Sequence, residues 1–535
     1  MNNFMNGMKQ ATNFGYTANG GLQHNHLMNA VYELYAKGGA YRQRSDDDCI
    51  FAFKQAFDED EELAMKCLFY LRDVCEGAGE RRFFRVCYNW LATKHPDAAR
   101  RNLKYVPTYG RFDDIFSLVD TPLENDAFAL VKHQLAMDAK DVMIPNGAIS
   151  LCAKWMPSIN TSSQKTRALG HKLRKYMGFS ERQYRKLLSA LRERINILER
   201  LMSANEWDKI DFSAIPSQAG IKYRKAFIRH DLERKKADPK AITYEEFVKD
   251  DSAKVNAGAM APYEVVHKAL NYLRKGYDYS YDWGAGRYIW RTEKGLDDTE
   301  RLAINKYWDN LTDYFKDAIF NGICVIDTSG SMTSGCGAAT PIDVAISLGL
   351  YCAERNHGPF ANHYISFASR PQMIEISGID FVDKVLRIYQ TNLVDNTNLE
   401  AVFNLMLETA INNNCSQDEI PQTVLAISDM QIDRGATFIS NYKSYDYDWN
   451  YTANQNRIRT MMEKMRERWS ARGYQMPKIV YWNVNATQDT FLDDGPDITY
   501  VSGASATIFK QVLSGKSGVD LMMDTLSSER YKDIH

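Results

Sequence analysis

The spacing of apolar side chains divides the chain into two stretches with different predicted secondary structure. From about residue 20 to residue 310, apolar residues recur at helical spacing and the strand signal is weak. The lengths of these segments are irregular and follow no fixed repeat, which favours a stack of helical hairpins, an α-solenoid. The predicted helices cover residues 27–35, 61–74, 82–91, 124–137, 164–177, 181–202, 221–235 and 262–273.

From about residue 320 the pattern changes to an alternation of strands and helices. Such alternation over the rest of the chain predicts a doubly wound, mostly parallel sheet. We therefore expect an all-α domain over residues 1–310 and an α/β domain over residues 311–535. The β-rich runs are 323–325, 363–367, 424–427 and 479–482, and the amphipathic segments between them are 342–354, 381–389, 399–411 and 455–472.

The composition is that of a soluble globular protein of several domains. The chain has 535 residues, of which 44% are hydrophobic and 25% charged, and its net charge is -2. No window approaches the 18 apolar residues of a membrane span, and residues 1–12 lack the apolar core of a secretory signal. The nine cysteines are scattered without a Cys-x-x-Cys pair, so we expect free thiols and a cytoplasmic location.

Oxygen-bearing side chains gather where predicted strands end and a helix begins. Asp327, Ser329 and Ser331 follow the first strand of the α/β domain, and Asp429 follows the run 424–427. Thr397 lies in the loop that enters the helix at 399. Ligands of open α/β sheets bind beyond the carboxyl ends of the strands, and carboxylates with hydroxyls suit Mg²⁺ or Mn²⁺. The sequence thus predicts a divalent-cation site with one position left for water or for an oxygen of a partner.

Two other interpretations of this region stay open. Asp327 could only cap the turn at Gly330, or the fold could have kept the loops and lost the metal. A metal-dependent hydrolase or nuclease is disfavoured, because no His flanks the loops and Glu400 is the only nearby Glu that could act as a base. We expect a protein that is not an enzyme.

Basic residues concentrate in two neighbouring stretches of the helical domain. Residues 164–200 contain eleven basic and three acidic side chains, and residues 221–236 contain seven and two. Aromatic residues lie between them, and this combination favours phosphates and unpaired bases of RNA over duplex DNA. A solvated helix face would give the same pattern in any single stretch. The candidate RNA contacts are Lys172, Arg174, Lys175, Arg185, Lys186, Arg192, Lys222, Arg224 and Lys225.

The cation-site loops resemble the metal-ion-dependent adhesion site of the von Willebrand factor A family. Asp327, Ser329 and Ser331 match the first loop of that site, Thr397 the second and Asp429 the third. The second loop departs from the pattern, because Asp395 and Asn396 stand where a glycine-rich lead-in is usual. The resemblance covers residues 320–535 and implies a Rossmann-like α/β fold that binds a divalent cation.

The order of the two domains resembles that of the Ro autoantigen (TROVE) family. Those proteins are RNA-binding rings of HEAT-like repeats closed by an A-like domain, so the resemblance implies a non-enzymatic RNA-binding protein. The helical part is also similar to an uncharacterised family of plants, fungi and phages. The residues that carry this similarity are 19–22, Arg72-Asp73, 77–81, 109–114, 154–158, 184–192, 202–207 and 225–231.

Two functions from different classes follow from these patterns. The first is binding of small structured RNA or single-stranded RNA ends by the basic helices, without any role for a membrane or duplex DNA. The second is a protein-binding scaffold whose metal takes up an acidic side chain of a partner. The two are compatible, because each uses a different domain.

Overall fold

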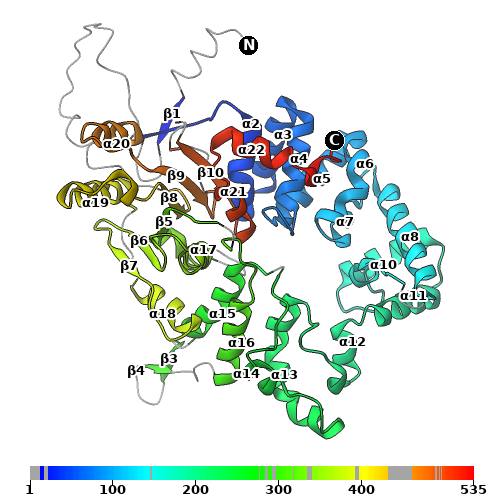
Figure 1. The fold of residues 1–535 in the computed structure, drawn as a ribbon. Coiled ribbons are helices and arrows are strands. Elements are labelled where there is room, and N and C mark those ends of the chain that lie inside the picture. Colours follow the sequence, from blue (N-terminus) through cyan, green and yellow to red (C-terminus); the bar gives the residue numbers. More distant parts are fainter. Residues whose placement is uncertain are drawn as a thin grey trace. The chain divides into compact units, whose positions relative to one another are not determined.

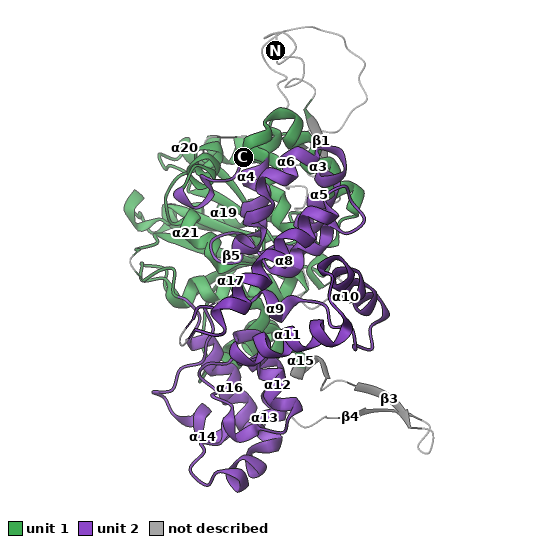
Figure 2. Cartoon of the chain, turned by 90° about the vertical axis from the view of Figure 1, so that its right-hand side faces the viewer, with its two compact units in different colours: residues 1–64, 261–295, 313–528 green, residues 65–260, 296–312, 529–535 purple. Residues whose placement is uncertain are grey.

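The computed structural model describes residues 13–16, 22–144, 147–258, 260–275, 278–282, 287–291, 297–316, 318–333, 340–391, 397–431, 461–487, 491–492, 495 and 497–535. The chain forms two compact units, which Figure 2 distinguishes by colour. The α/β unit comprises residues 1–64, 261–295 and 313–528, and the helical unit comprises residues 65–260, 296–312 and 529–535. The units are therefore interleaved along the chain and cut across the division that the sequence suggested near residue 310.

A six-stranded mixed sheet forms the centre of the α/β unit (Figure 1). Its order is β10-β9-β8-β5-β6-β7, and every neighbouring pair is parallel except β6 and β7. The inner strand β5 is buried along its whole length, as its apolar run requires. The strands are β5 (Gly322–Asp327), β6 (His363–Phe367), β7 (Met373–Glu375), β8 (Thr423–Ser428), β9 (Lys478–Asn483) and β10 (Ile498–Ser502).

Helix α17 (Pro341–Arg355) is the most deeply buried helix against this sheet. All its residues from Pro341 to Ala353 are buried. Gly349 allows this close approach, because a Cβ at that position would collide with the side chain of Ile326 on β5. The other helices of this part are α18 (Phe381–Thr391), α19 (Leu399–Asn412), α20 (Met461–Ser470), α21 (Phe509–Val512) and α22 (Gly518–Leu526).

The N-terminal part of the chain covers the edge strand β10. Helix α2 (Ala30–Lys37) leads into the 3-10 helix η1 (Gly38–Gln43), and α3 (Asp46–Glu59) follows. The Tyr500 N–H donates to the Tyr32 hydroxyl at 3.2 Å, and the Gly39 N–H donates to the Ser502 hydroxyl at 3.0 Å. Covering the edge in this way occupies strand groups that could otherwise pair with another chain.

A second excursion of the chain, residues 261–295, also belongs to the α/β unit. It contributes α15 (Pro262–Lys275), which packs against α17 and α18. There His267 Nδ1 lies 2.7 Å from the carboxylate of Asp343, which is fully buried at the start of α17. The unit also has two short hairpins, β1 (Phe14–Tyr16) with β2 (Leu22–His24) and β3 (Asp278–Asp282) with β4 (Arg287–Arg291). Residues 437–455 are rich in Tyr, Asn and Asp, a composition that predicts a surface insertion, and they lie outside the described residues.

The helical unit follows the predicted succession of helices, with one correction. A single helix was expected over residues 181–202, but the structure ends α11 at Arg194 and begins α12 at Leu198. Asn196 adopts a left-handed φ of 47° between them, a conformation that Asn tolerates and that ends a helix. The helices are α4 (Glu61–Arg72), α5 (Arg81–Lys94), α6 (Pro96–Asn102), α7 (Val106–Tyr109), α8 (Glu124–Asp141), α9 (Cys152–Trp155), α10 (Gln164–Met177), α11 (Glu181–Arg194), α12 (Leu198–Ser203), α13 (Ser217–Ala237), α14 (Tyr244–Lys249) and α16 (Asp298–Asp309).

The last residues of the chain, 529–535, pack within the helical unit. The guanidinium of Arg530 donates two hydrogen bonds, of 2.8 and 2.9 Å, to the carboxylate of Asp73, which is fully buried. The Tyr531 hydroxyl donates to the same carboxylate at 3.0 Å, and its ring stacks on that of Tyr109. These contacts tie the C-terminal segment to the loop that follows α4.

The structure confirms a helical N-terminal part and a C-terminal part built on a mixed sheet. None of the helices within the described ranges combines the length and hydropathy that crossing a bilayer requires.

Candidate cation site and basic surface

The predicted metal ligands lie at one end of the sheet. Strands β5 and β8 are parallel neighbours, with Ile326 paired to Ile427, so their carboxyl ends meet at the same edge. Asp327 is the last residue of β5, and Asp429 directly follows β8. Thr397 comes two residues before α19 and is 2% exposed.

Hydrogen bonds hold the first loop in place. The Asp327 carboxylate accepts from the Ser329 N–H at 2.9 Å through one oxygen and from the Ser428 hydroxyl through the other. The hydroxyls of Ser329 and Ser331 are 3.1 Å apart, and the Ser331 hydroxyl also hydrogen-bonds Asp429. The first and third predicted loops therefore contact each other directly.

Gln431 connects the second and third loops, and sequence reasoning did not single it out. Its N–H donates to the Asp429 carboxylate at 3.2 Å, and its carbonyl accepts from the Thr397 hydroxyl at 2.6 Å. Ser428, which supports Asp327, was missed as well. The only sequence signal for either was its place beside Asp429 at a strand end. Asp395 and Asn396, the unusual residues of the second loop, lie outside the described residues.

The electrostatics of the two aspartates favour a cation. Burial raises the pKa of Asp327 to about 7, and the nearby carboxylate of Asp429 adds to this shift. Burial raises the pKa of Asp429 too, although hydrogen bonds to its carboxylate counteract it. Two buried carboxylates repel each other at neutral pH unless a positive charge compensates them.

The donor set fits a hard divalent ion. Two carboxylates and three hydroxyls are oxygen ligands of the kind that Mg²⁺ and Mn²⁺ take. In the described part of the chain, no group of three or more His, Cys, Asp or Glu side chains could hold a metal, so a site here depends on the hydroxyls. When bound, the ion would supply Lewis acidity and a position for an oxygen of another molecule.

Five of the nine predicted RNA contacts are exposed on the helical unit. Lys175 is at the end of α10, Arg185 and Lys186 are on α11, and Lys222 and Lys225 are on α13. Lys225 lies 3.7 Å from the Glu300 carboxylate, so part of its charge is compensated within the unit.

The other four predicted contacts, Lys172, Arg174, Arg192 and Arg224, interact with groups of the protein itself. Arg192 donates to the carbonyls of Ala153 and Met156 and to the Ser158 hydroxyl, and thereby holds the segment after α9. Arg224 is 7% exposed and pairs with Glu300 at 3.2 Å.

Lys172 and Arg174 on α10 are similarly engaged. Lys172 forms ion pairs with Asp120 and Glu124 at 2.7 and 2.6 Å. Arg174 donates to the carbonyl of Phe179 at 2.7 Å and so supports the turn between α10 and α11.

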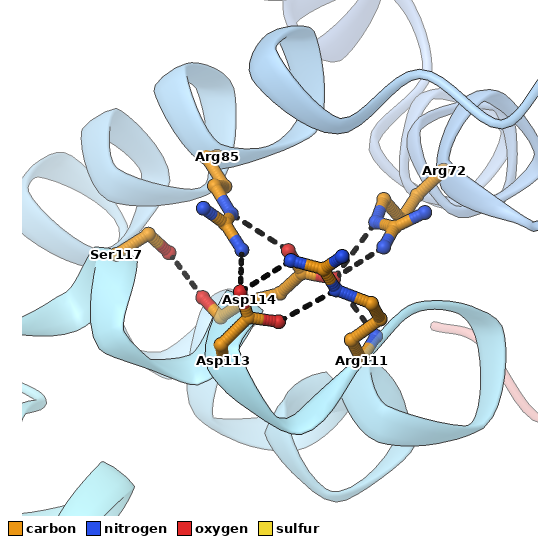
Figure 3. A network of polar contacts seen from close by, with 6 residues as sticks. All are labelled: Arg72, Arg85, Arg111, Asp113, Asp114 and Ser117. Carbon is orange, nitrogen blue, oxygen red and sulfur yellow. Dashed lines mark hydrogen bonds and ion pairs between the residues drawn. The ribbon is translucent and has the colours of Figure 1, made fainter. Parts of the chain in front are cut away.

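A buried network of arginines and aspartates, which we call the arginine cluster, lies elsewhere in the helical unit (Figure 3). Asp114 is fully buried in the 3-10 helix η3 (Phe112–Leu118). Its carboxylate accepts hydrogen bonds from Arg72 Nε at 2.8 Å, from Arg85 Nε at 2.6 Å and from the Arg111 N–H at 2.8 Å, and it forms an ion pair with a terminal nitrogen of Arg72 at 2.7 Å. Asp113 binds the guanidinium groups of Arg85 and Arg111.

The arginine cluster brings together in space several segments that lie apart in the sequence. Arg111 also places its guanidinium 3.8 Å from the centre of the Trp155 ring. Arg72, the segments 77–81 and 109–114, and Lys154-Trp155 were singled out as a shared sequence pattern, but their pairing could not be derived from spacing.

Comparisons with known proteins match both stretches of the chain to families without an assigned activity. Residues 321–533 match a domain of unknown function (DUF7788), and residues 17–109 and 160–318 match another (DUF2828). The chain is 28% identical to the uncharacterized protein L728 of Acanthamoeba polyphaga mimivirus over 542 residues, which covers 94% of this chain and 85% of that protein.

Among solved structures, the chain is similar to the Ro (RSR) protein of Deinococcus radiodurans. The sequence identity is 13% and the TM-score 0.45, and the match covers 94% of this chain and 99% of that one.

Proposed function

We propose that this protein binds RNA without chemically changing it, through the exposed basic residues of α10, α11 and α13. The observation that carries the proposal is the set of cations on these helices that have no acidic partner among the described residues. Lys175, Lys186 and Lys222 are all exposed in this way. The order of the two domains also resembles that of the Ro family, with its ring of HEAT-like repeats, and we include that architecture in the proposal.

The chemistry of these side chains supports RNA rather than an acidic protein. Flexible lysine ammonium groups neutralise backbone phosphates as point charges and release the counterions around them. Aromatic side chains, which stack on unpaired bases, are available on the same helices: Tyr176 is exposed at the end of α10, and Tyr223 is half-buried on α13. Single strands and loops are therefore the preferred ligands, since no element within the described ranges has the form of a groove-reading module.

Fluorescence anisotropy with a single-stranded RNA, a structured RNA and a DNA duplex tests the proposal. Raising the salt from about 50 to about 200 mM should weaken RNA binding steeply, with a logarithmic slope of ~0.7 for each phosphate contacted by single strands. Removing the charges of Lys175, Lys186 and Lys222 together by Gln should lower that slope by about 2. The matched control is Lys94→Gln, because Lys94 is an exposed cation at the end of α5. Absence of binding at the lower salt would refute the proposal.

A second function, capture of an acidic partner through a bound cation, is supported by the meeting of Asp327 and Asp429 at one edge of the sheet. A cation held there by Ser329, Ser331 and Thr397 as well would keep a position for a carboxylate of the partner.

Electron paramagnetic resonance of added Mn²⁺ is a direct measurement for this second function. We expect one tightly bound ion per chain, none in Asp327→Ala, and a change in the signal when a peptide with a single Asp is added. If all the Mn²⁺ stays free in the presence of wild-type protein, the cation site is refuted, and the function that depends on it is refuted as well.

A further inference from the structure

The arginine cluster carries more positive charge than its own carboxylates compensate. Three guanidinium groups, those of Arg72, Arg85 and Arg111, surround the two carboxylates of Asp113 and Asp114. Arg72 and Asp114 are buried, whereas the side chains of Arg85, Arg111 and Asp113 are 31%, 23% and 21% exposed, which leaves two guanidinium groups to one carboxylate on the accessible side. The accessible side of the cluster is therefore cationic.

Arg81 precedes Arg85 by four residues in α5, so the two guanidinium groups extend from the same face of the helix. Its side chain is exposed and makes no hydrogen bond or ion pair with any residue in the described part of the chain. Partial desolvation lowers the pKa of Arg81, and repulsion from Arg111, Arg85 and Arg72 lowers it further, while attraction by Asp113 is the weakest influence. The three neighbouring guanidinium groups therefore act on Arg81 more strongly than the carboxylate of Asp113 does.

The position of Arg81 in helix α5 also favours an anion. Arg81 and Arg82 are the first two residues of this 14-residue helix, and its first turn contains no acidic side chain. The side chain of the preceding residue, Glu80, does not cap the helix. Cations are unfavourable beside the positive end of a helix dipole, whereas the free N–H groups there bind phosphates well. The arrangement is unfavourable for the protein alone and becomes favourable with a bound anion.

We propose that Arg81, together with Arg85 and Arg111, binds a phosphate group of the RNA backbone. This inference rests on the proposed RNA-binding function and adds a site that the charge counts along α10, α11 and α13 did not include. Guanidinium forks match the oxygens of a phosphate and bind it through paired hydrogen bonds.

The other partners of these arginines keep them in place for such a ligand. The aspartates orient Arg85 and Arg111, and the Trp155 ring supports the guanidinium of Arg111. Arg81 differs from them, because its guanidinium group has no hydrogen-bond or ion-pair partner in the described part of the chain and can bind the phosphate alone.

The experiment compares Arg81→Gln with wild type in RNA binding at several salt concentrations. Loss of one phosphate contact should weaken binding about tenfold at low salt and lower the salt slope by about one, whatever the RNA sequence. Arg81→Lys should recover part of the affinity, because an ammonium keeps the charge but not the fork. The matched control is Lys94→Gln, which removes one charge from the same helix about 20 Å farther along its axis. Because Arg81 is exposed, thermal unfolding of these variants should match wild type.

The outcomes separate the two proposals. If Arg81→Gln binds RNA with unchanged affinity and slope while the Lys175, Lys186 and Lys222 variant is impaired, the phosphate site is refuted and the RNA-binding function stands. If wild-type protein binds no RNA, the RNA-binding function is refuted. Calorimetric titration with inorganic phosphate then tests whether the arginine cluster binds an anion at all. Phosphate binding that Arg81→Gln abolishes would keep the site as an oxyanion site. Equal or absent binding in both proteins would refute it. Binding of an Asp-rich peptide in place of phosphate would also overturn the assignment.

Discussion

Replacing Asp114 by Asn should destabilise the helical unit strongly. Asp114 is fully buried and is the common acceptor for Arg72, Arg85 and the Arg111 N–H, at distances of 2.6 to 2.8 Å. Asn has nearly the same shape but no charge, and its amide NH₂ would face a guanidinium group that can only donate. The substitution therefore leaves the buried guanidinium of Arg72 without a counter-charge.

The expected loss of unfolding free energy is about 3–5 kcal/mol, the range for removing one partner of a buried ion pair. For a domain of this size class, each kcal/mol lowers Tm by ~2–4 °C, so the melting transition of the helical unit should move down by ~6–20 °C. The effect should be local, because the cluster belongs to the helical unit alone.

Hydrogen exchange followed by mass spectrometry is the appropriate assay, because two compact units need not unfold in one transition. Peptides from residues 65–120 should lose protection in Asp114→Asn, whereas peptides from β5 and β8 should not change. The matched control is Asp113→Asn, because the Asp113 side chain is 21% exposed and its loss should cost only about 1 kcal/mol. If Asp114→Asn stayed within 1 kcal/mol of wild type, or if both substitutions cost the same, the argument from burial would be wrong.

Three further outcomes test other parts of the structure. Mg²⁺ at about 100 times its Kd should stabilise the protein by ~2.7 kcal/mol in thermal unfolding, and Asp327→Ala should abolish the effect; an unchanged Tm would contradict a metal site. Arg530→Ala, which removes the counter-charge of buried Asp73, should cost ~3–5 kcal/mol and speed exchange in residues 70–110, whereas exposed Lys532→Ala should have no effect. Burial raises the pKa of Asp113, but bonds from two arginines outweigh it and hold the pKa below the usual 3.8. Its stabilisation should be complete above that pH and disappear as the pH falls through the lower folded value, so acid titrations of wild type and Asp113→Asn should converge there.

The parts of the structure that could be predicted are those encoded locally. A buried strand has to be apolar along its length, so β5 was recognised from Ile323 to Val325 and its end at Asp327 followed. Parallel neighbours bring strand ends together, which made the approach of Asp327 and Asp429 predictable from topology. Whether a metal binds there stays a prediction.

The rest depended on contacts between residues far apart in sequence. A charge count cannot distinguish exposed Lys186 from Arg224, which is buried because Glu300 arrives from another helix. The same applies to Arg72 and Asp114, because the sequence around each residue contains no pattern that indicates their ion pair. The edge strand β10 was missed as a strand, and so was the role of residues 30–43 in covering it.

The pairing of α2 with the edge strand has a consequence for how the chain folds during synthesis. Tyr32 and Tyr500 are 468 residues apart. At about 5–20 residues per second, a ribosome needs roughly 20–90 s to make the strand after the helix has emerged. During that time the apolar face of α2 has no sheet to cover, while the whole helical unit except its last segment is already available to fold. Chaperone binding should therefore concentrate on the first 60 residues of the nascent chain, although these residues end up as the cap of the last strand to be made.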